Sequence, residues 1–253
     1  FAAMEDMYRA NYASEEFSEE FRDTLIASFR EKLHMKSSVY TFQLDSAESA
    51  PSRGVMTESK HDDRGNVHQK QSNRELLAFC AFTDMNPSDD GRKRKYFSAF
   101  NVAPSLAGAR VGDAMMRTAL DAVAEESVIC ADCLLSKDIS GTYINRKGFV
   151  GRRTHLLNGI EILSIERDDR INGRFIAKGD KWNAEKIFSI VNDHSDTESR
   201  FERDGIVYTV SAYGNEDLSP IREGYVLTRY IRDPESRRAV CIFESDPKMP
   251  LHS

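Results

Sequence analysis

Apolar residues recur along the 253-residue chain at two different spacings, which predict helices in some segments and strands in others. Between residues 14 and 33 an apolar residue recurs about every four positions, from Phe17 to Leu33, after an acidic turn that begins at Ser14. This spacing predicts a helix with one packed face. Residues 38–44 are rich in β-branched and aromatic side chains, and residues 76–83 are almost continuously apolar. Both runs predict strands, the second buried on both faces.

Residues 45–75 break this pattern because they are polar and contain almost nothing to bury. We expect them to form a long mobile loop or insert. After the strand over 76–83, the segment 86–91 supplies proline, aspartate and glycine, and a further strand begins at Lys95. A turn of this composition between two strands predicts an antiparallel hairpin.

The stretch from Tyr96 to Met116 joins three elements of different character. A strand stops at Pro104, a loop of small residues follows, and an amphipathic helix runs from Val111 to about Glu126. Small residues let the backbone approach a ligand, and the free N–H groups of a helix start bind anions. The stretch therefore predicts a phosphate-binding loop. Residues 128–135 form another apolar run, so strand, helix and strand predict a parallel crossover.

The remaining chain divides near residue 169. Residues 138–147 predict a short helix ended by Gly148, and residues 149–165 predict one or two strands around an Asn158–Gly159 turn. The charged run 167–170 marks a domain boundary. We therefore expect an α/β domain with a central mixed sheet flanked by helices over residues 1–169, with 45–75 as its insert.

A second, smaller module is expected over residues 170–253, either β-rich or α+β. Its strand candidates are separated by turn signals. Residues 182–188, which overlap the candidate 187–191, are the alternative and would form one short helix. We find no catalytic motif in this part. The strand candidates are 175–177, 187–191, 205–212, 224–231 and 239–244.

Composition narrows the classes of function. Charged residues make up 30% of the chain and the formal net charge is −6, so no overall field attracts nucleic acid. No apolar stretch approaches the roughly 20 residues that span a bilayer. We expect a cytoplasmic protein with no nucleic-acid or membrane partner. The four cysteines lie in apolar surroundings and predict buried thiols; Cys130 and Cys133 form a C-x-x-C without a second ligand pair, so we expect no metal.

Two segments together resemble the GNAT superfamily of acyl-CoA-dependent N-acyltransferases. The first, from Asn101 to Met116, reads Asn-Val-Ala-Pro-Ser-Leu-Ala-Gly-Ala-Arg-Val-Gly-Asp-Ala-Met-Met and matches that family's strand, Val-x-Pro and glycine-rich loop. The slots of the loop motif fall on Ala107, Arg110 and Gly112, and only Gly112 keeps the family residue. The second, Tyr143 to Phe149, is similar to the family's Tyr-x-Lys-x-Gly-Phe ending, with Ile144 in the tyrosine slot. The resemblance covers residues 1–169.

The resemblance implies a three-layer fold that binds acetyl-CoA as co-substrate. Its pantetheine arm would pair with the backbone at the end of the strand before the loop, and its pyrophosphate would lie on the backbone N–H groups of the loop and helix start. Ser140 would lie near the pantetheine. The implied cofactor-binding residues are Phe100, Val102, Ala103, Ala107, Gly108, Ala109, Arg110, Val111, Gly112, Asp113 and Ser140.

Transfer to an amine needs a base, a donor for the carbonyl oxygen and an acid for the thiolate. Asp132 is the one carboxylate within an apolar strand, so we expect burial to raise its pKa and make it a base. A structural aspartate is the alternative interpretation. Tyr143 is the candidate acid if its side chain points where the family's tyrosine does. The backbone N–H near Val102 is the candidate donor.

The leading hypothesis is therefore an N-acyltransferase that moves an acetyl group from acetyl-CoA to a primary amine by direct attack. One alternative is an inactive GNAT-like module that binds coenzyme A or a protein partner, because Ala107 and Ile144 both lack the functional side chains of the family. A third is an effector delivered into another cell. The expected partner is an amine-bearing acceptor, either a small molecule or a protein, and a homodimer is a further alternative.

Overall fold

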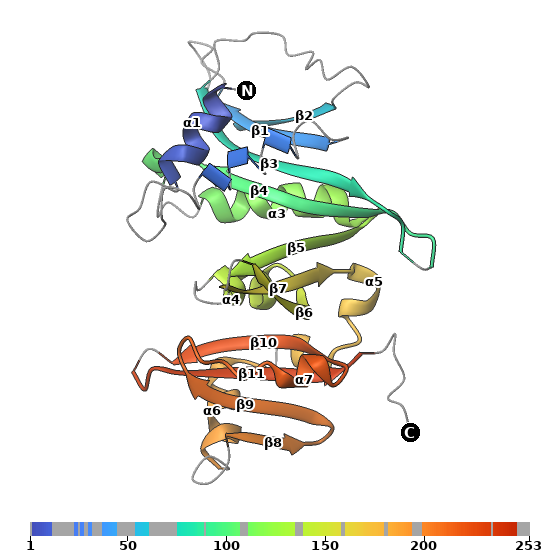
Figure 1. Ribbon diagram of the computed structural model, residues 1–253, viewed down its shortest axis with the longest axis vertical. Helices are drawn as coiled ribbons and strands as arrows, with labels where there is room; N and C mark the ends of the chain where they lie inside the picture. The colour runs from blue at the N-terminus through green and yellow to red at the C-terminus, as the bar shows by residue number, and fades with distance from the viewer. Residues whose placement is uncertain are drawn as a thin grey trace. The chain divides into compact units, whose positions relative to one another are not determined.

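A computed structural model of the protein (Figure 1) describes the chain in segments between residues 2 and 246. Contacts divide it into two compact units, Phe1–Ile129 and Cys130–Ser253, and each is described separately below. The predicted division at residue 169 stays a prediction. The described residues are 2–11, 23–24, 26–27, 30–31, 37–44, 54–60, 75–88, 90–106, 111–134, 139–157, 160–179, 182–193, 199–233 and 235–246.

The first unit is built on strands ordered β2-β1-β3-β4. Their pairing is antiparallel throughout, so the hairpin predicted around 86–91 is confirmed. Within the expected insert, Gly54–Lys60 forms β2 on the edge of β1, and the rest of 45–74 lies outside the described residues. The strands are β1 (Ser37–Leu44), β2 (Gly54–Lys60), β3 (Glu75–Met85) and β4 (Arg94–Val102).

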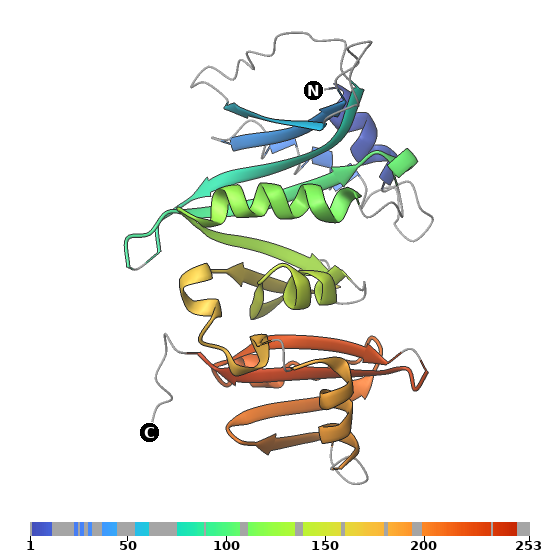
Figure 2. The same cartoon turned by 180° about the vertical axis from the view of Figure 1, so that it is seen from behind.

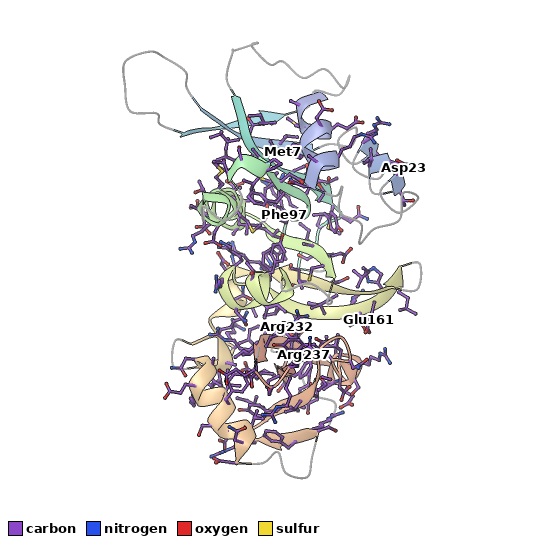
Figure 3. All side chains as sticks on the ribbon, turned by 90° about the vertical axis from the view of Figure 1, so that its left-hand side faces the viewer. Met7, Asp23, Phe97, Glu161, Arg232 and Arg237 are labelled. Carbon is purple, nitrogen blue, oxygen red and sulfur yellow. The ribbon has the colours of Figure 1, made fainter. Side chains whose placement is uncertain are left out.

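Helices cover both faces of these strands. Figures 1 and 2 show α1 (Ala2–Asn11) and α3 (Val111–Ala124) on opposite sides of β3 and β4. Met7 of α1, labelled in Figure 3, belongs to a buried cluster with Ala99 of β4 and with Ala103, the residue after that strand. Since side chains alternate between the faces of a strand, Phe100 and Val102 face the other way, toward α3. The helix predicted over 14–33 lies largely outside the described residues.

The predicted crossover follows β4. A short 3-10 turn, η1 (Pro104–Leu106), leads toward α3, and β5 (Val128–Leu134) follows the helix. The N–H of Val128 donates to the carbonyl of Lys93 at 3.0 Å, so β5 begins beside the beginning of β4 and the two run parallel. The α/β class with a mixed sheet flanked by helices is thus confirmed.

The second unit has strands in the order β5-β7-β6-β10-β11-β9-β8. The pairs β6–β7, β6–β10, β10–β11, β11–β9 and β8–β9 are antiparallel. Figure 2 shows α4 and α6 on the face turned to the viewer. The elements are α4 (Ile139–Arg146), β6 (Val150–Leu157), β7 (Ile160–Arg167), α5 (Asp169–Asn172), η2 (Ile176–Lys178), α6 (Ala184–Asn192), β8 (Arg200–Arg203), β9 (Ile206–Ala212), α7 (Ser219–Arg222), β10 (Tyr225–Asp233) and β11 (Arg238–Ser245).

Two of the strands predicted in the C-terminal part are wrong. Residues 176–178 form η2, and residues 184–192 form α6, so the α+β alternative holds for this part. The run of β-branched residues in 187–191 resembles a strand, but Asn183 caps a helix by accepting the N–H of Lys186 at 2.9 Å. The fully buried Ile187 and Val191, four residues apart, then pack one helical face against β9 and β11.

Side-chain bonds to backbone groups tie this C-terminal part to α4. Asn145 donates to the carbonyl of Tyr230 at 2.6 Å and accepts its N–H at 3.2 Å, which satisfies both backbone groups of that β10 residue. Lys178 donates to the carbonyls of Ile144 and Phe149, at 2.5 Å each. The region around α4 therefore depends on residues that lie 29 to 85 positions further along the chain.

The four cysteines are buried free thiols, as predicted. Among the residues that the structure describes, no helix is both long and apolar enough to cross a membrane.

Candidate functional site

The junction between β4 and α3 is the described part of the predicted cofactor site. Phe100 and Val102 lie at the end of β4. Ala103 follows the strand, and its N–H donates to the Leu77 carbonyl at 2.8 Å. Val111, Gly112 and Asp113 form the first turn of α3. The loop residues Ala107, Gly108, Ala109 and Arg110 lie outside the described residues, so their part in the site stays a prediction.

Gly112 brings the beginning of α3 unusually close to β4. A Cβ atom at this position would lie 2.9 Å from Cγ2 of Val102 and 3.8 Å from Cε1 of Phe100. Ordinary carbon contacts lie at about 3.5–4.0 Å, so even alanine would overlap with Val102. The glycine of the motif therefore allows close packing between strand and helix, which places the helix N-terminus beside the strand end.

The charge of Asp113, in the first turn of α3, is partly compensated within the helix. Its carboxylate pairs with Arg117 one turn later, at 3.5 Å. The partial positive charge of the N–H groups at the start of this 14-residue helix is compatible with an anionic ligand.

Asp132 differs from expectation in its surroundings. It is exposed, although the apolar sequence around it predicted burial, while Ala131 and Cys133 on either side are buried. Its Oδ1 accepts a hydrogen bond from Ser164 Oγ of β7 at 2.6 Å. The expected burial is therefore wrong because the strand presents this one position to the polar side chains of neighbouring strands.

Ser164 and His155 were not singled out in the sequence. Ser164 Oγ lies 3.4 Å from Nδ1 of His155, which is exposed on β6. The β6–β7 register pairs Arg153 with Ser164 and His155 with Ile162, so these four side chains share one face. Glu161, labelled in Figure 3, lies at the start of β7 and pairs with Leu156, so its side chain is on the opposite face of the hairpin. Asp132, Ser164 and His155 together form a polar cluster on β5, β7 and β6.

Tyr143 lies in the middle of α4 and is half-buried. Its ring packs edge-to-face against Phe149, with centroids 5.5 Å apart. Ile144, in the tyrosine slot of the motif, is fully buried. Ser140 lies in the first turn of α4. Gly148, at a φ of +78°, ends this segment, and Phe149 N–H donates back to the Tyr143 carbonyl at 3.2 Å.

Comparison with known proteins returned matches among solved structures only, since no family model and no curated protein sequence matches the chain. The matched structures include the NatC complex bound to a Gag peptide and CoA (13% identity, 66% of this chain, 89% of that chain, TM-score 0.40). They also include histone acetyltransferase HPA2 and related acetyltransferase from Corynebacterium glutamicum (13% identity, 66% and 90%, TM-score 0.40). A protein from Bordetella pertussis, described as a GNAT-family acetyltransferase, matches at 15% identity over 66% and 88%, with a TM-score of 0.36. The last two of these structures are described as acetyltransferases.

Proposed function

We propose that this protein transfers an acetyl group from acetyl-CoA to a primary amine. The observation that supports this most is the junction at Gly112, where the absence of a side chain lets the start of α3 approach the end of β4. A helix N-terminus placed beside a strand end suits a cofactor that carries a diphosphate at one end and an amide-bearing arm at the other.

In this proposal the first-turn N–H groups of α3 hold the pyrophosphate of acetyl-CoA. The backbone from Phe100 to Ala103 pairs with the pantetheine arm, and the N–H near Val102 polarises the thioester carbonyl. The acceptor amine attacks that carbonyl directly, and Tyr143 is the candidate proton donor for the thiolate. Arg110 adds a charge-assisted contact to phosphate.

The proposal is tested by titrating acetyl-CoA into the purified full chain by calorimetry, followed by a thiol-release assay. The assay uses a polyamine, a peptide with a free N-terminus and an N-terminally blocked lysine peptide as acceptors. We expect binding and release of one free thiol per acetylated amine. Absence of binding at millimolar acetyl-CoA would refute the proposal.

A second function, an inactive module that binds coenzyme A or a protein partner, is favoured by one observation. Ile144 is fully buried in the motif slot where a tyrosine would donate a proton, and the ring of Tyr143 packs on Phe149 instead. Binding of acetyl-CoA without thiol release for any acceptor, over a range of pH, would support this second function over the first.

A further inference from the structure

The side chain of Asn11, the last residue of α1, is bonded to the end of β4. Its Nδ2 atom donates to Oδ1 of Asn101 at 3.0 Å and to the backbone carbonyl of Val102 at 3.1 Å. Asn11 lies four residues after Met7, on the helix face that packs against β4. These residues and the proposed cofactor site belong to the same compact unit, so their relative positions are defined.

The two bonds fix the orientation of both side-chain amides. A backbone carbonyl can only accept a hydrogen bond, so the Asn11 atom beside Val102 must be the nitrogen. That nitrogen donates both of its protons, so the Asn101 atom that faces it must be the oxygen. Exchanging the oxygen and nitrogen of either amide would place two donors or two acceptors face to face. Nδ2 of Asn101 is therefore the end of the amide that does not meet Asn11.

Nδ2 of Asn101 is consequently a buried donor without an acceptor. Only 3% of Asn101 is exposed, and no atom of the described residues accepts a hydrogen bond from this nitrogen. A buried donor that has lost water and gained no partner destabilises the state that contains it. The end of β4 thus holds one strong donor that the fold itself does not use.

The Val102 carbonyl points away from β3. In the peptide group that joins Val102 to Ala103, the N–H donates to the Leu77 carbonyl of β3 at 2.8 Å. The peptide group is trans, so its C=O is directed to the opposite side. This carbonyl therefore lies on the edge of β4 that β3 leaves open, which is the edge available to the proposed pantetheine arm. The Asn11 amide occupies the position that a ligand N–H would take there.

Asn11 is the solvent-facing member of this contact. It is exposed, whereas Val102 is half-buried and Asn101 is buried. Because Asn11 ends α1, its side chain can turn into solvent while the buried Met7, one turn earlier, keeps its packing. This movement uncovers the Val102 carbonyl and frees the Asn101 amide to present Nδ2 to an arriving molecule.

We propose that the Val102 carbonyl and the Asn101 side chain form a binding site for an amide-bearing ligand, which displaces Asn11 from it; this inference rests on the proposed acetyl transfer. A ligand N–H donates to the Val102 carbonyl, and a ligand carbonyl oxygen accepts from Nδ2 of Asn101. The pantetheine arm of acetyl-CoA and a peptide acceptor both carry such groups. ADP and polyamines carry no amide.

The exchange of hydrogen bonds favours the ligand. The Val102 carbonyl keeps one donor, because the ligand N–H replaces Nδ2 of Asn11. The exposed Asn11 amide finds water in place of its lost partners, so its release costs little. Nδ2 of Asn101 gains an acceptor that it lacks among the described residues. The gain from ligand binding therefore comes mainly from Asn101.

The first test measures affinities for coenzyme A and for ADP by calorimetry, in the full wild-type chain and in Asn101→Leu. Leucine is similar in volume to asparagine and removes the unpartnered donor, so the unfolding midpoint in urea should stay equal or rise. The affinity for coenzyme A should fall about tenfold, while the affinity for ADP, which lacks the arm, should change less than about twofold.

Two variants of α1 complete this test. Asn11→Ala removes the side chain that competes for the Val102 carbonyl, so the affinity for coenzyme A should rise about threefold. Arg9→Gln is the matched control, because Arg9 is exposed on the same helix and pairs with Glu5. It should leave both affinities within about twofold of the wild type.

A second arm identifies the source of the amide. The thiol-release assay gives KM for a peptide with a free N-terminus and for a polyamine, in the wild type and in Asn101→Leu. If the peptide supplies the amide, its KM should rise about tenfold while the affinity for coenzyme A and the KM of the polyamine stay unchanged. If pantetheine supplies it, the affinity for coenzyme A should fall and the KM of both acceptors should stay unchanged.

Nitrogen-15 NMR of asparagine-labelled protein observes the site directly. The side-chain NH₂ signals of Asn101 are assigned by their loss in Asn101→Leu. We expect them to shift when coenzyme A or the peptide is added, according to which ligand supplies the amide, and to stay in place when ADP is added.

The outcomes separate this inference from the proposed function. In Asn101→Leu, an unchanged affinity for coenzyme A together with an unchanged KM for the peptide would overturn the site and leave acetyl transfer standing. An equal fall in the affinities for coenzyme A and ADP would also overturn it, as would weaker binding of both amide-bearing ligands in Asn11→Ala. Absence of acetyl-CoA binding to the wild type would instead refute the proposed function, and this inference with it.

Discussion

Replacing Gly112 with alanine should disturb both the packing of the first unit and its proposed ligand site. The added Cβ would lie 2.9 Å from Cγ2 of Val102, about 0.6–1.1 Å closer than an ordinary carbon contact. Val102 is a short, β-branched side chain with few alternative rotamers, so it cannot turn away easily. The start of α3 must therefore move away from β4, or the strand end must shift.

The size of the effect follows from two opposing terms. Overpacking by one methyl group costs about 1–3 kcal/mol. Alanine is a better helix former than glycine by up to about 1 kcal/mol, but Gly112 is the second residue of α3, where little of this gain applies. We expect Gly112→Ala to lower the free energy of unfolding by about 1–2 kcal/mol. Displaced N–H groups should also weaken acetyl-CoA binding about tenfold, equivalent to about 1.4 kcal/mol.

Urea denaturation gives the stability, and calorimetric titration of acetyl-CoA gives the affinity. Val102→Ala removes the overlapping Cγ2 atom, so the double variant should regain affinity, with a favourable coupling energy of about 1 kcal/mol or more between the two sites. Gly151→Ala is a control in the second unit, where an added Cβ would lie 2.9 Å from Cβ of Leu227. It should lower stability and leave the affinity of the folded protein unchanged. Wild-type stability and affinity in Gly112→Ala would refute the packing argument.

Further predictions concern the second unit. Burial and the neighbouring Arg229 lower the pKa of Lys178 to about 7 in the folded protein. In the unfolded chain the pKa of this lysine is about 10.4. Between these two pH values the unfolded state therefore binds more protons than the folded state. The free energy of unfolding should therefore rise from about pH 7 to about pH 9, and Lys178→Met should flatten this rise in urea titrations at both pH values. Asn145→Leu leaves the backbone N–H and carbonyl of Tyr230 without their side-chain partner. The unfolding midpoint in urea should therefore fall by an amount equivalent to about 1–3 kcal/mol. Asn145→Asp keeps the acceptor for the Tyr230 N–H, so its loss of stability should be smaller. A fragment ending at residue 169 lacks β10 and leaves the edge of β6 unpaired, so gel filtration should show it aggregated; a monodisperse fragment would support the predicted domain boundary.

The sequence predicted the elements around the cofactor site well. From residue 75 to residue 167 each predicted strand and helix occurs within a few residues of its expected bounds, because alternation, turn chemistry and helix ends agree with one another there. Where local signals conflict, prediction failed. The β-branched run at 187–191 favours a strand, yet the cap at Asn183 and packing against β9 make it a helix.

The candidate site was predicted less completely, because its contacts depend on the order and pairing of strands that are far apart in the sequence. Asp132 was singled out because it interrupts an apolar run, but which neighbours it would meet depends on strand order. The Asn158–Gly159 turn implies a register that pairs Arg153 with Ser164, and this pairing is observed. That β7 lies next to β5 was not predictable from local pattern, so the contact between Ser164 and Asp132 needed the structure.

The outermost strand of the second unit has a consequence for self-association. β8 is only four residues long, Arg-Phe-Glu-Arg, and three of them are charged. Phe201 turns inward and stacks on Tyr208, with ring centroids 4.8 Å apart, while Arg200 pairs with Glu223 at 2.5 Å. A second chain that extended this sheet would gain few backbone bonds and would have to dehydrate several charges. The strand β8 thus disfavours edge-to-edge association of sheets from different chains. A dimer of this protein should use a different surface.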